Sequence, residues 1–205
     1  MQIAEVFSNF IDYMNSGGFV MWPLFIANFF MWYGIGYRFH TLRKRNIGSV
    51  RRLVYKHKRK KQKKRIKGIL DMAINEAIQI KKRYPQLEQH SLRMFLDDML
   101  FKYKQEIKRY SRLVKVIVIV APLTGLLGTV VGMIETFDSM ASMTLFSQTG
   151  GIAGGISQAL FTTQFGLIVA VPGLIIGRIL DKRERNLELE FEQLKDIICS
   201  QGEIK

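Results

Sequence analysis

Three long apolar stretches alternate with strongly charged segments along the chain. The first, Phe19 to Tyr37, carries no charged side chain, and the others run from Val116 to Phe137 and from Ile156 to Ile179. Each is long enough for a helix that crosses about 30 Å of hydrocarbon. The pattern therefore predicts an all-α membrane protein with three transmembrane helices.

The spacing of these stretches divides the chain into seven segments. Glu5 and Asp12 stand where a cleaved signal peptide would carry basic residues, so we interpret the first stretch as a retained anchor. The predicted segments are an N-terminal segment (1–18), transmembrane helices at 19–38, 114–137 and 155–179, a basic helical domain (39–113), a short connection (138–154) and a helical tail (180–205).

Outside the apolar stretches, apolar residues recur at intervals of three and four, which is typical of amphipathic helices. One series covers 69–78 and stops before Pro85, a second covers 92–110, and a third covers 180–198. We expect the second series to enter the second transmembrane helix without interruption and the third to continue the last one. We expect these stripes to pack on one another or on neighbouring subunits, and the cation-rich segment 43–67 to be a loop drawn to anionic lipid headgroups.

The charge distribution predicts the orientation. Lys and Arg number 31 against 17 Asp and Glu, for a net charge of +14, yet residues 1–37 and 116–177 contain no Lys or Arg. Basic segments stay on the cytoplasmic side of the membrane. We therefore expect a multi-pass membrane protein with a periplasmic N-terminus and a cytoplasmic C-terminus. The single cysteine, Cys199, excludes an intrachain disulfide and is interpreted as a packing or surface thiol.

Small residues line one face of each of the last two predicted helices. Gly125, Gly128 and Gly132 follow one another at helical spacing in the second, and Gly166 belongs to a similar series in the third. Helices in lipid associate through close backbone approach, which such residues permit. We expect the two helices to pack closely as an antiparallel hairpin.

Polar residues accompany these glycines. Thr129 lies in the second stretch, and Gln158, Thr162 and Thr163 lie in the third. Threonine hydroxyls can bond to carbonyl groups of their own helix, but an amide inside a membrane needs partners or water. The cluster indicates either a wetted path or a docking surface for a polar helix. Because no acidic, basic or histidine side chain lies in the core of any span, we expect a partner to supply any carboxylate that an ion path needs.

The motifs "APLTGLLGTVVGMI" and "GISQALFTTQFGLIVAVPGLI" closely resemble the paired membrane signature of the MotA/TolQ/ExbB proton-channel family, and three spans with an external N-terminus resemble its ExbB/TolQ branch. The resemblance implies a homopentameric ring around two copies of a single-span ExbD/TolR-like partner with a transmembrane aspartate. It places Thr129 and Thr163 on the ion route, with Thr162 beside them, and maps family prolines onto Pro122 and Pro172.

The function that the resemblance implies is an ion-driven motor subunit, not an enzyme, that uses proton-motive force to energise transport across the periplasm and outer membrane, with a TonB-like energy transducer as a further partner. Gln158 departs from the glutamate that is familiar at this place in the family, which leaves sodium open as the ion. The alternative is a membrane scaffold whose basic loop binds lipid or nucleic acid. For the motor subunit, the main interpretation, we expect no nucleic acid as a partner. Neither a metal nor another cofactor is expected, because the histidines lack metal-ligand spacing.

Overall fold

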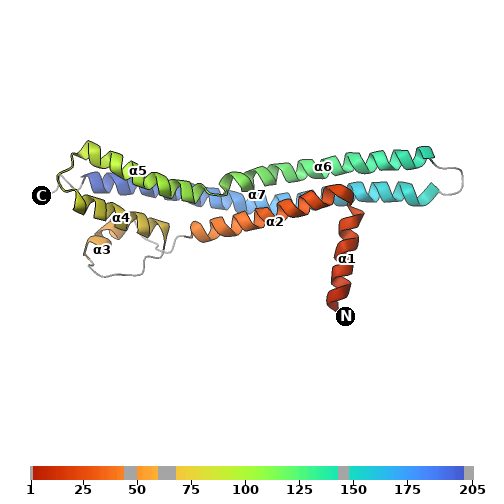
Figure 1. Cartoon of the computed structure of the whole chain (residues 1–205), viewed down its shortest axis with the longest axis horizontal. Coiled ribbons are helices and arrows are strands. Elements are labelled where there is room, and N and C mark those ends of the chain that lie inside the picture. The colour runs from red at the N-terminus through yellow and green to blue at the C-terminus, as the bar shows by residue number, and fades with distance from the viewer. Residues whose placement is uncertain (1, 44–49, 60–67, 143–147, 201–205) are drawn as a thin grey trace. The chain divides into compact units, whose positions relative to one another are not determined.

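The computed structural model describes residues 2–43, 50–59, 68–142 and 148–200, and nearly all of them are helical (Figure 1). The helices are α1 (Gln2–Ser16), α2 (Gly18–Thr41), α3 (Val50–Arg59), α4 (Ile69–Arg83), α5 (Gln89–Lys108), α6 (Ser111–Ser142) and α7 (Gln148–Ser200). They form two compact units. We call Met1–Ile35 with Arg112–Gly177 the apolar unit, and Gly36–Ser111 with Arg178–Lys205 the basic unit.

Three helical stretches are long and apolar enough to cross a membrane, as predicted. They are Gly18–Thr41, Gln89–Ala141 and Ile152–Ser200. Their apolar side chains are exposed over much of the surface, among them Leu123, Leu127 and Leu167. In water such a surface would be unstable, whereas in lipid it needs no covering.

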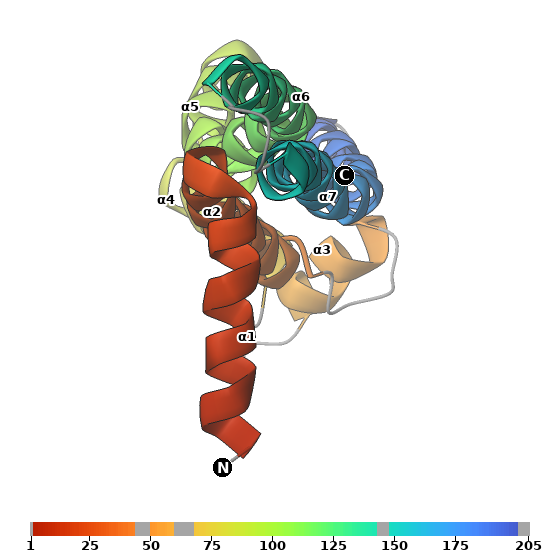
Figure 2. The same ribbon diagram turned by 90° about the vertical axis from the view of Figure 1, so that its right-hand side faces the viewer.

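In the apolar unit, α2 and α6 lie beside α7, and α6 and α7 run antiparallel (Figure 1). Helix α1 leaves the end of α2 almost at a right angle, so that it lies across the view in which the other three are seen end-on (Figure 2). The direction changes at Gly17 and Gly18. Gly18 has φ +63°, a left-handed conformation that suits glycine.

In the basic unit, α4, α5 and the C-terminal part of α7 share a core. The predicted stripe on α7 is confirmed, because Leu187, Phe191 and Leu194 are all buried, and Leu96 and Ile74 are buried on α5 and α4. The stripes therefore pack on one another within one chain. On α5, however, Phe95 was expected in the stripe and is half-exposed, stacked on Tyr84.

A series of ion pairs joins α5 to α7. The pairs are Arg93–Asp196 (2.8 Å), Asp97–Lys195 (2.7 Å), Lys104–Glu192 (2.6 Å) and Lys108–Glu188 (2.6 Å). Residue numbers rise on α5 as they fall on α7, so the two helices are antiparallel. Apart from Lys195, which is buried, these side chains are partly or fully exposed, so each pair contributes little; their order shows the register of the two helices.

The expectation of an uninterrupted helix from the 92–110 stripe into the second span is wrong. α5 ends at Lys108 and α6 begins at Ser111. Tyr110 between them has φ +60°, which breaks the helical hydrogen bonding and strains a bulky side chain. Its ring packs edge-on against Tyr37 at 5.0 Å, and the Arg109 guanidinium lies over both rings. The apolar repeat alone could not reveal the break, because its phase continues across it.

Two predicted loops are shorter than expected. Part of the cation-rich segment 43–67 forms α3, where Val50, Leu53 and Val54 are buried on one face despite the many charges. Similarly, α6 extends to Ser142 and α7 starts at Gln148, so much of the predicted connection 138–154 is helical. Hydropathy marks the end of the apolar surface, whereas a helix continues as long as its backbone bonds are made. The rest of 43–67 and residues 143–147 lie largely outside the described part of the chain.

Candidate functional site: the α6–α7 pair

The glycines of α6 lie directly against α7. A Cβ atom placed on Gly132 would come within 2.6 Å of the Gly155 carbonyl oxygen, and one on Gly166 within 2.8 Å of the Ala121 carbonyl oxygen. Gly125 likewise faces the backbone of Thr162 and Thr163. A side chain at any of these positions would push the helices apart, so the small residues set their close approach.

Two threonines lie inside this contact. Thr162 is fully buried with its side chain over Gly128, and Thr136 is buried against Gly155. The Thr136 hydroxyl donates to the Gly132 carbonyl (2.8 Å), and the Thr162 hydroxyl donates to the carbonyl of Ala159 (3.0 Å). Both hydroxyls are thus satisfied within their own helix, and the threonine side chains, with the hydroxyl oxygen nearest to each glycine, fill the notches that the glycines leave.

Thr129 and Thr163 lie at the edge of the same contact and are only half-buried. Each comes one residue after a contact residue, Gly128 on α6 and Thr162 on α7. Because the helices are antiparallel, one step forward along each chain turns to the same side of the pair. Since Gly125 faces Thr163, Thr129 lies about one helical turn, roughly 6 Å, further along the axis. We call this side, marked by Thr129 and Thr163, the threonine edge.

The hydroxyls on the threonine edge are anchored but retain acceptor capacity. Thr129 Oγ1 donates to the Leu126 carbonyl at 2.7 Å, and Thr163 Oγ1 donates to the Ala159 carbonyl at 3.0 Å. A hydroxyl that donates once still has lone pairs on its oxygen. The edge can therefore accept hydrogen bonds from water or from a protonated carboxyl group. The apolar sequences around Thr129 and Thr163 contain no acidic or basic side chain.

Gln158 lies on the opposite side of α7. It precedes the contact residue Ala159 by one step, and its side chain packs against Gly18 at the α1–α2 junction. A Cβ atom on Gly18 would come within 2.5 Å of Gln158 Nε2. Gln158 is therefore separated from the threonine edge by the width of the helix, although it belongs to the same sequence motif.

Each spanning helix contains a proline in its interior. Pro122 lies in α6, Pro172 lies in α7, and Pro23 lies in α2. A proline cannot donate to the carbonyl four residues earlier, so each leaves one carbonyl oxygen without its helical donor. Neighbouring helices can tolerate such an interruption in a membrane protein.

A buried cation that sequence reasoning missed lies at the basic end of α2. Arg38 is 1% exposed and pairs with Asp181 (2.9 Å) and Glu184 (2.6 Å) of α7. In the sequence it looks like the first charge after an apolar stretch, and only the three-dimensional contact with two carboxylates distinguishes it. Two of its guanidinium nitrogens, Nε and Nη1, are buried without an acceptor, so the pairing is under-satisfied.

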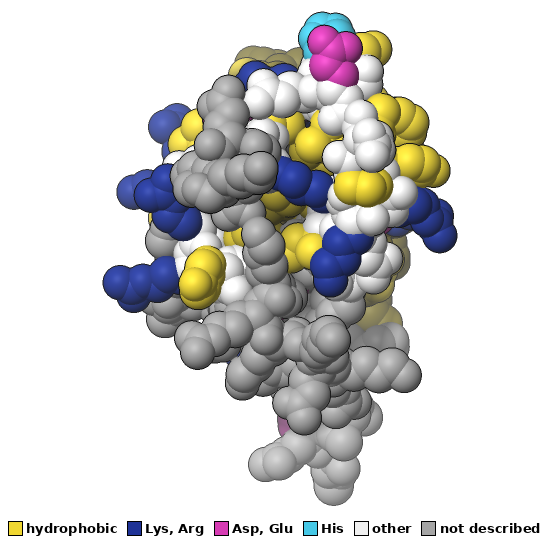
Figure 3. Space-filling view, turned by 90° about the vertical axis from the view of Figure 1, so that its left-hand side faces the viewer, with side chains coloured by type: hydrophobic (Ala, Val, Ile, Leu, Met, Phe, Trp, Pro, Cys, Tyr) yellow, Lys and Arg dark blue, Asp and Glu magenta, His cyan; other side chains and the backbone are white. Residues whose placement is uncertain are grey.

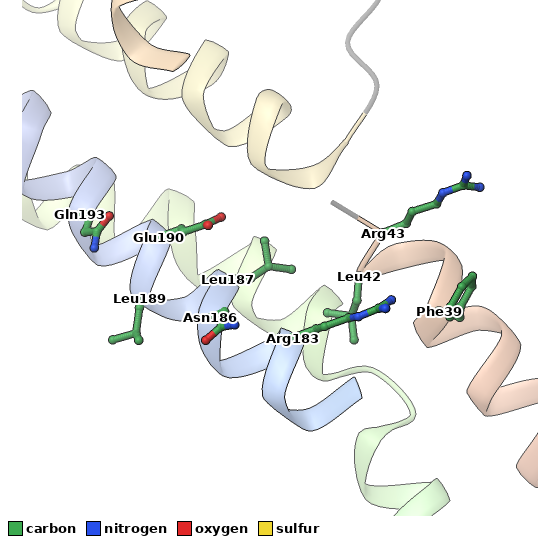
Figure 4. A pocket seen from close by; sticks show the side chains of 9 residues that line it. All are labelled: Phe39, Leu42, Arg43, Arg183, Asn186, Leu187, Leu189, Glu190 and Gln193. Carbon is green, nitrogen blue, oxygen red and sulfur yellow. The ribbon is translucent and has the colours of Figure 1, made fainter. Parts of the chain in front are cut away.

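Next to this cluster, an open hollow of about 650 Å³ lies between the end of α2 and α7 (Figure 4). Its lining combines the apolar side chains of Phe39, Leu42 and Leu189 with Arg43 and Arg183. The Arg183 guanidinium lies over the Phe39 ring at 5.4 Å. The lining also includes Glu190, so the hollow has a small excess of positive charge beside apolar surface, and its lining holds no Ser, Thr, Cys or His that could act as a nucleophile or base.

The rest of the basic unit presents mostly cations. Figure 3 looks onto one end of the molecule and shows Lys and Arg side chains spread around it. Within the described residues, no three His, Cys, Asp or Glu side chains are close enough to hold a metal ion. Cys199 is partly buried, and this burial raises the pKa of its thiol, as expected for an unreactive packing residue.

A pair of close-packed apolar helices with polar hydroxyls along one edge, joined to a charged helical unit, is typical of an integral membrane protein. The model of the MotA/TolQ/ExbB proton channel family matches residues 62–193. The chain belongs to this family.

Curated relatives point to the ExbB-like branch. The chain is 40% identical over 74 residues to putative biopolymer transport protein ExbB-like 3 of Synechocystis, which is 36% of this chain and 35% of the relative. It is 41% identical over 69 residues to biopolymer transport protein exbB1 of Vibrio cholerae, 34% of this chain and 30% of the relative. It is also 38% identical over 74 residues to biopolymer transport protein ExbB of Aquifex aeolicus, 36% and 49% of the two chains. The alignments thus span about a third to a half of these relatives.

Proposed function

We propose that the protein is the channel and motor subunit of an ExbB/TolQ-like complex in the bacterial inner membrane. It uses proton-motive force to drive a single-span partner and thereby energises transport across the periplasm and outer membrane. The observation that carries the proposal is the threonine edge: two hydroxyls on one side of a close-packed helix pair, with no titratable group between them. Family membership supports the same role.

The absence of an acid from this edge determines the kind of partner. Proton relay through a bilayer needs a titratable side chain at membrane depth. We therefore propose that a single-span helix of the ExbD/TolR type brings an aspartate to Thr129 and Thr163, whose hydroxyl oxygens accept a hydrogen bond donated by the protonated carboxyl group or by an intervening water. A ring of five copies would surround this partner with five such edges, and a TonB-like protein would receive the work.

The orientation follows from charge. The basic unit carries all described Lys and Arg residues except Arg112 and Lys115, which begin the α6 part of the apolar unit. We propose that the basic unit and the C-terminus are cytoplasmic and that α1 is periplasmic, in accord with the positive-inside rule. The segment 43–67 and the hollow with Arg43 and Arg183 would then meet anionic headgroups of the inner leaflet.

Substitution by valine tests the edge without changing side-chain shape. We expect Thr129→Val and Thr163→Val each to lower proton flux at least tenfold in proteoliposomes that also contain an ExbD-type partner, because each change leaves a carboxyl or water facing a methyl group. Thr124→Val is the matched control, since Thr124 lies on another face of α6 and bonds the Val120 carbonyl at 2.9 Å. Normal flux in both edge variants, with normal expression and assembly, would refute the assignment.

The same proteoliposomes distinguish two alternative functions from the proposed one. A sodium-driven version would show flux that requires a sodium gradient and is insensitive to a proton gradient, with hydroxyl oxygens as ligands. A scaffold that acts through lipid or nucleic acid would survive both valine changes but lose function when the cations of 43–67 are neutralised. Mass determination of the intact complex would test the proposed pentamer.

A further inference from the structure

The turn between α5 and α6 interrupts a sequence that favours one continuous helix. Residues 99–121 contain no Gly, Pro, Asn or Asp, which are the residues that most often mark helix ends. Buried apolar residues recur across the turn at steps of seven, about two helical turns, and these are Leu100, Ile107, Val114 and Ala121. Helical propensity and periodicity therefore give no reason for α5 to end at Lys108.

The turn has a conformational cost, which falls on Tyr110 and on the residues after it. The φ of +60° at Tyr110 lies in the left-handed region, where the Cβ atom of an L-residue comes too close to a neighbouring carbonyl oxygen. The N–H groups of residues 111–113 stand at the start of α6, where the helix offers them no carbonyl. In a continuous helix they would donate to the carbonyls of residues 107–109. Contacts outside the turn must therefore offset both losses.

Tyr37 of α2 provides such contacts. Its ring packs edge-on against the Tyr110 ring at 5.0 Å, and its hydroxyl donates to the Glu106 carboxylate. The Arg109 guanidinium lies 5.6 Å from the centre of the Tyr37 ring and 5.4 Å from that of the Tyr110 ring. Aromatic pairs, cation–π contacts and hydrogen bonds to a charged group are each stabilising. One side chain from a different helix thus contacts three residues at the turn.

The position of Tyr37 depends in turn on α7. The next residue, Arg38, is buried and pairs with Asp181 at 2.9 Å and Glu184 at 2.6 Å. These two carboxylates hold the end of α2 at this level. Tyr37 is therefore presented to the turn by a helix end that a third helix holds in place.

We propose that the contact of Tyr37 with Glu106, Arg109 and Tyr110 is a latch on a joint with two conformations. With the latch closed, Arg109 and Tyr110 form the turn seen in the structure. When Tyr37 withdraws, Tyr110 takes the helical φ that its sequence context favours, and α5 and α6 join into one helix. The end of α2 thereby controls the conformation of the joint. This inference does not depend on the function proposed above.

Hydrogen–deuterium exchange of the full-length chain in lipid nanodiscs, followed by mass spectrometry, tests the proposal. We expect Tyr37→Ala to slow exchange of the amides of residues 111–113 about tenfold or more, because they gain helical acceptors. A residue that only packed against the turn would give the opposite sign, since lost packing speeds local opening. The matched control is Phe30→Ala, which removes an exposed ring from the same face of α2 seven residues earlier and should leave the exchange unchanged.

Two further variants separate the latch from general damage to the fold, for which exchange in α4 is the reference. Tyr37→Phe keeps the ring and loses only the bond to Glu106, so it should slow the same amides about twofold and decides the matter if Tyr37→Ala loses protection in α4. Adding Tyr110→Gly to Tyr37→Ala should restore fast exchange, because glycine adopts a positive φ without strain and disfavours the helix. Unchanged or faster exchange of residues 111–113 in both Tyr37 variants would overturn the proposal, and so would slow exchange in the double variant.

Discussion

The contact between Gly128 and Thr162 makes a quantitative test of the α6–α7 packing. A Cβ atom on Gly128 would lie within 3.0 Å of the Thr162 side chain, including 2.8 Å from its Cγ2. Carbon atoms normally meet at about 3.5–4.0 Å, so Gly128→Ala must separate the helices by roughly 1 Å. The Cβ atom of Thr162 is also too close, and no rotamer change moves it. Overpacking of this kind costs about 1–3 kcal/mol.

A second substitution removes the Thr162 side chain that the new Cβ atom would meet. Thr162→Gly alone leaves a notch beside Gly128 and is destabilising, but in the double variant the new alanine occupies the vacated space. We expect the double variant to be more stable than the sum of the two single changes predicts, by about 1–3 kcal/mol. Unfolding in mixed detergent and dodecyl sulfate, followed by circular dichroism, would measure the free energies.

A glycine without close neighbours provides the control. A Cβ atom on Gly36 in α2 would meet no neighbouring atom within 4 Å, so Gly36→Ala should leave stability equal or slightly raised. If Gly128→Ala behaved like Gly36→Ala, or if the double variant were merely additive, the packing described for α6 and α7 would be refuted.

Three further predictions concern the basic unit, each measured by the same unfolding assay. Arg38→Met should cost about 3 kcal/mol, because two carboxylates lose their buried partner, whereas the exposed Arg43→Met should have little effect; equal effects would contradict the ion cluster. Hydrogen bonds from Lys104 and, to a lesser extent, Lys195 lower the pKa of Glu192 from 4.5 to about 2. The Glu192 carboxylate therefore contributes to the free energy of unfolding above pH 4.5, and this contribution is lost as pH falls towards 2. The side chain is 44% exposed, which limits this contribution to about 1 kcal/mol, and Glu192→Gln but not Glu88→Gln should reduce the acid-dependent loss. Finally, Tyr110→Gly should be more stable than Tyr110→Ala by about 1 kcal/mol, the reverse of their order in a helix, because of the φ of +60°; the usual order would show that the turn is not maintained.

Much of the fold can be predicted from periodicity and charge. Apolar length predicts the three spans, and spacing predicts the helices on either side of Pro85 and the buried stripe that contains Phe191. These features depend on local sequence and on the partition between lipid and water. The break at Tyr110 could not be predicted, because it depends on contacts with Tyr37, which is far away in the sequence.

The candidate site was predicted less completely. The motifs bring Thr129, Thr163, Thr162 and Gln158 together as one set of polar residues, but the structure places them in three environments. Thr129 and Thr163 share an edge, Thr162 fills the notch at Gly128, and Gln158 packs on Gly18. Sequence spacing gives the face of a residue on its own helix, whereas its role here depends on which neighbouring helix that face meets. Ion passage along the threonine edge is a prediction, which the valine substitutions would test.

The uninterrupted course of α7 has a mechanical consequence. Its 53 residues form one helix of about 80 Å, in which Pro172 leaves a single helical hydrogen bond unmade, with Thr163 in one part and Phe191 in another. Twisting such a helix strains many backbone bonds at once, whereas α5 and α6 are joined by a two-residue turn without this ladder of bonds. One helix thus carries both Thr163, on the threonine edge, and Phe191, in the core of the basic unit, so a rotation of α7 at either residue would strain the backbone that leads to the other.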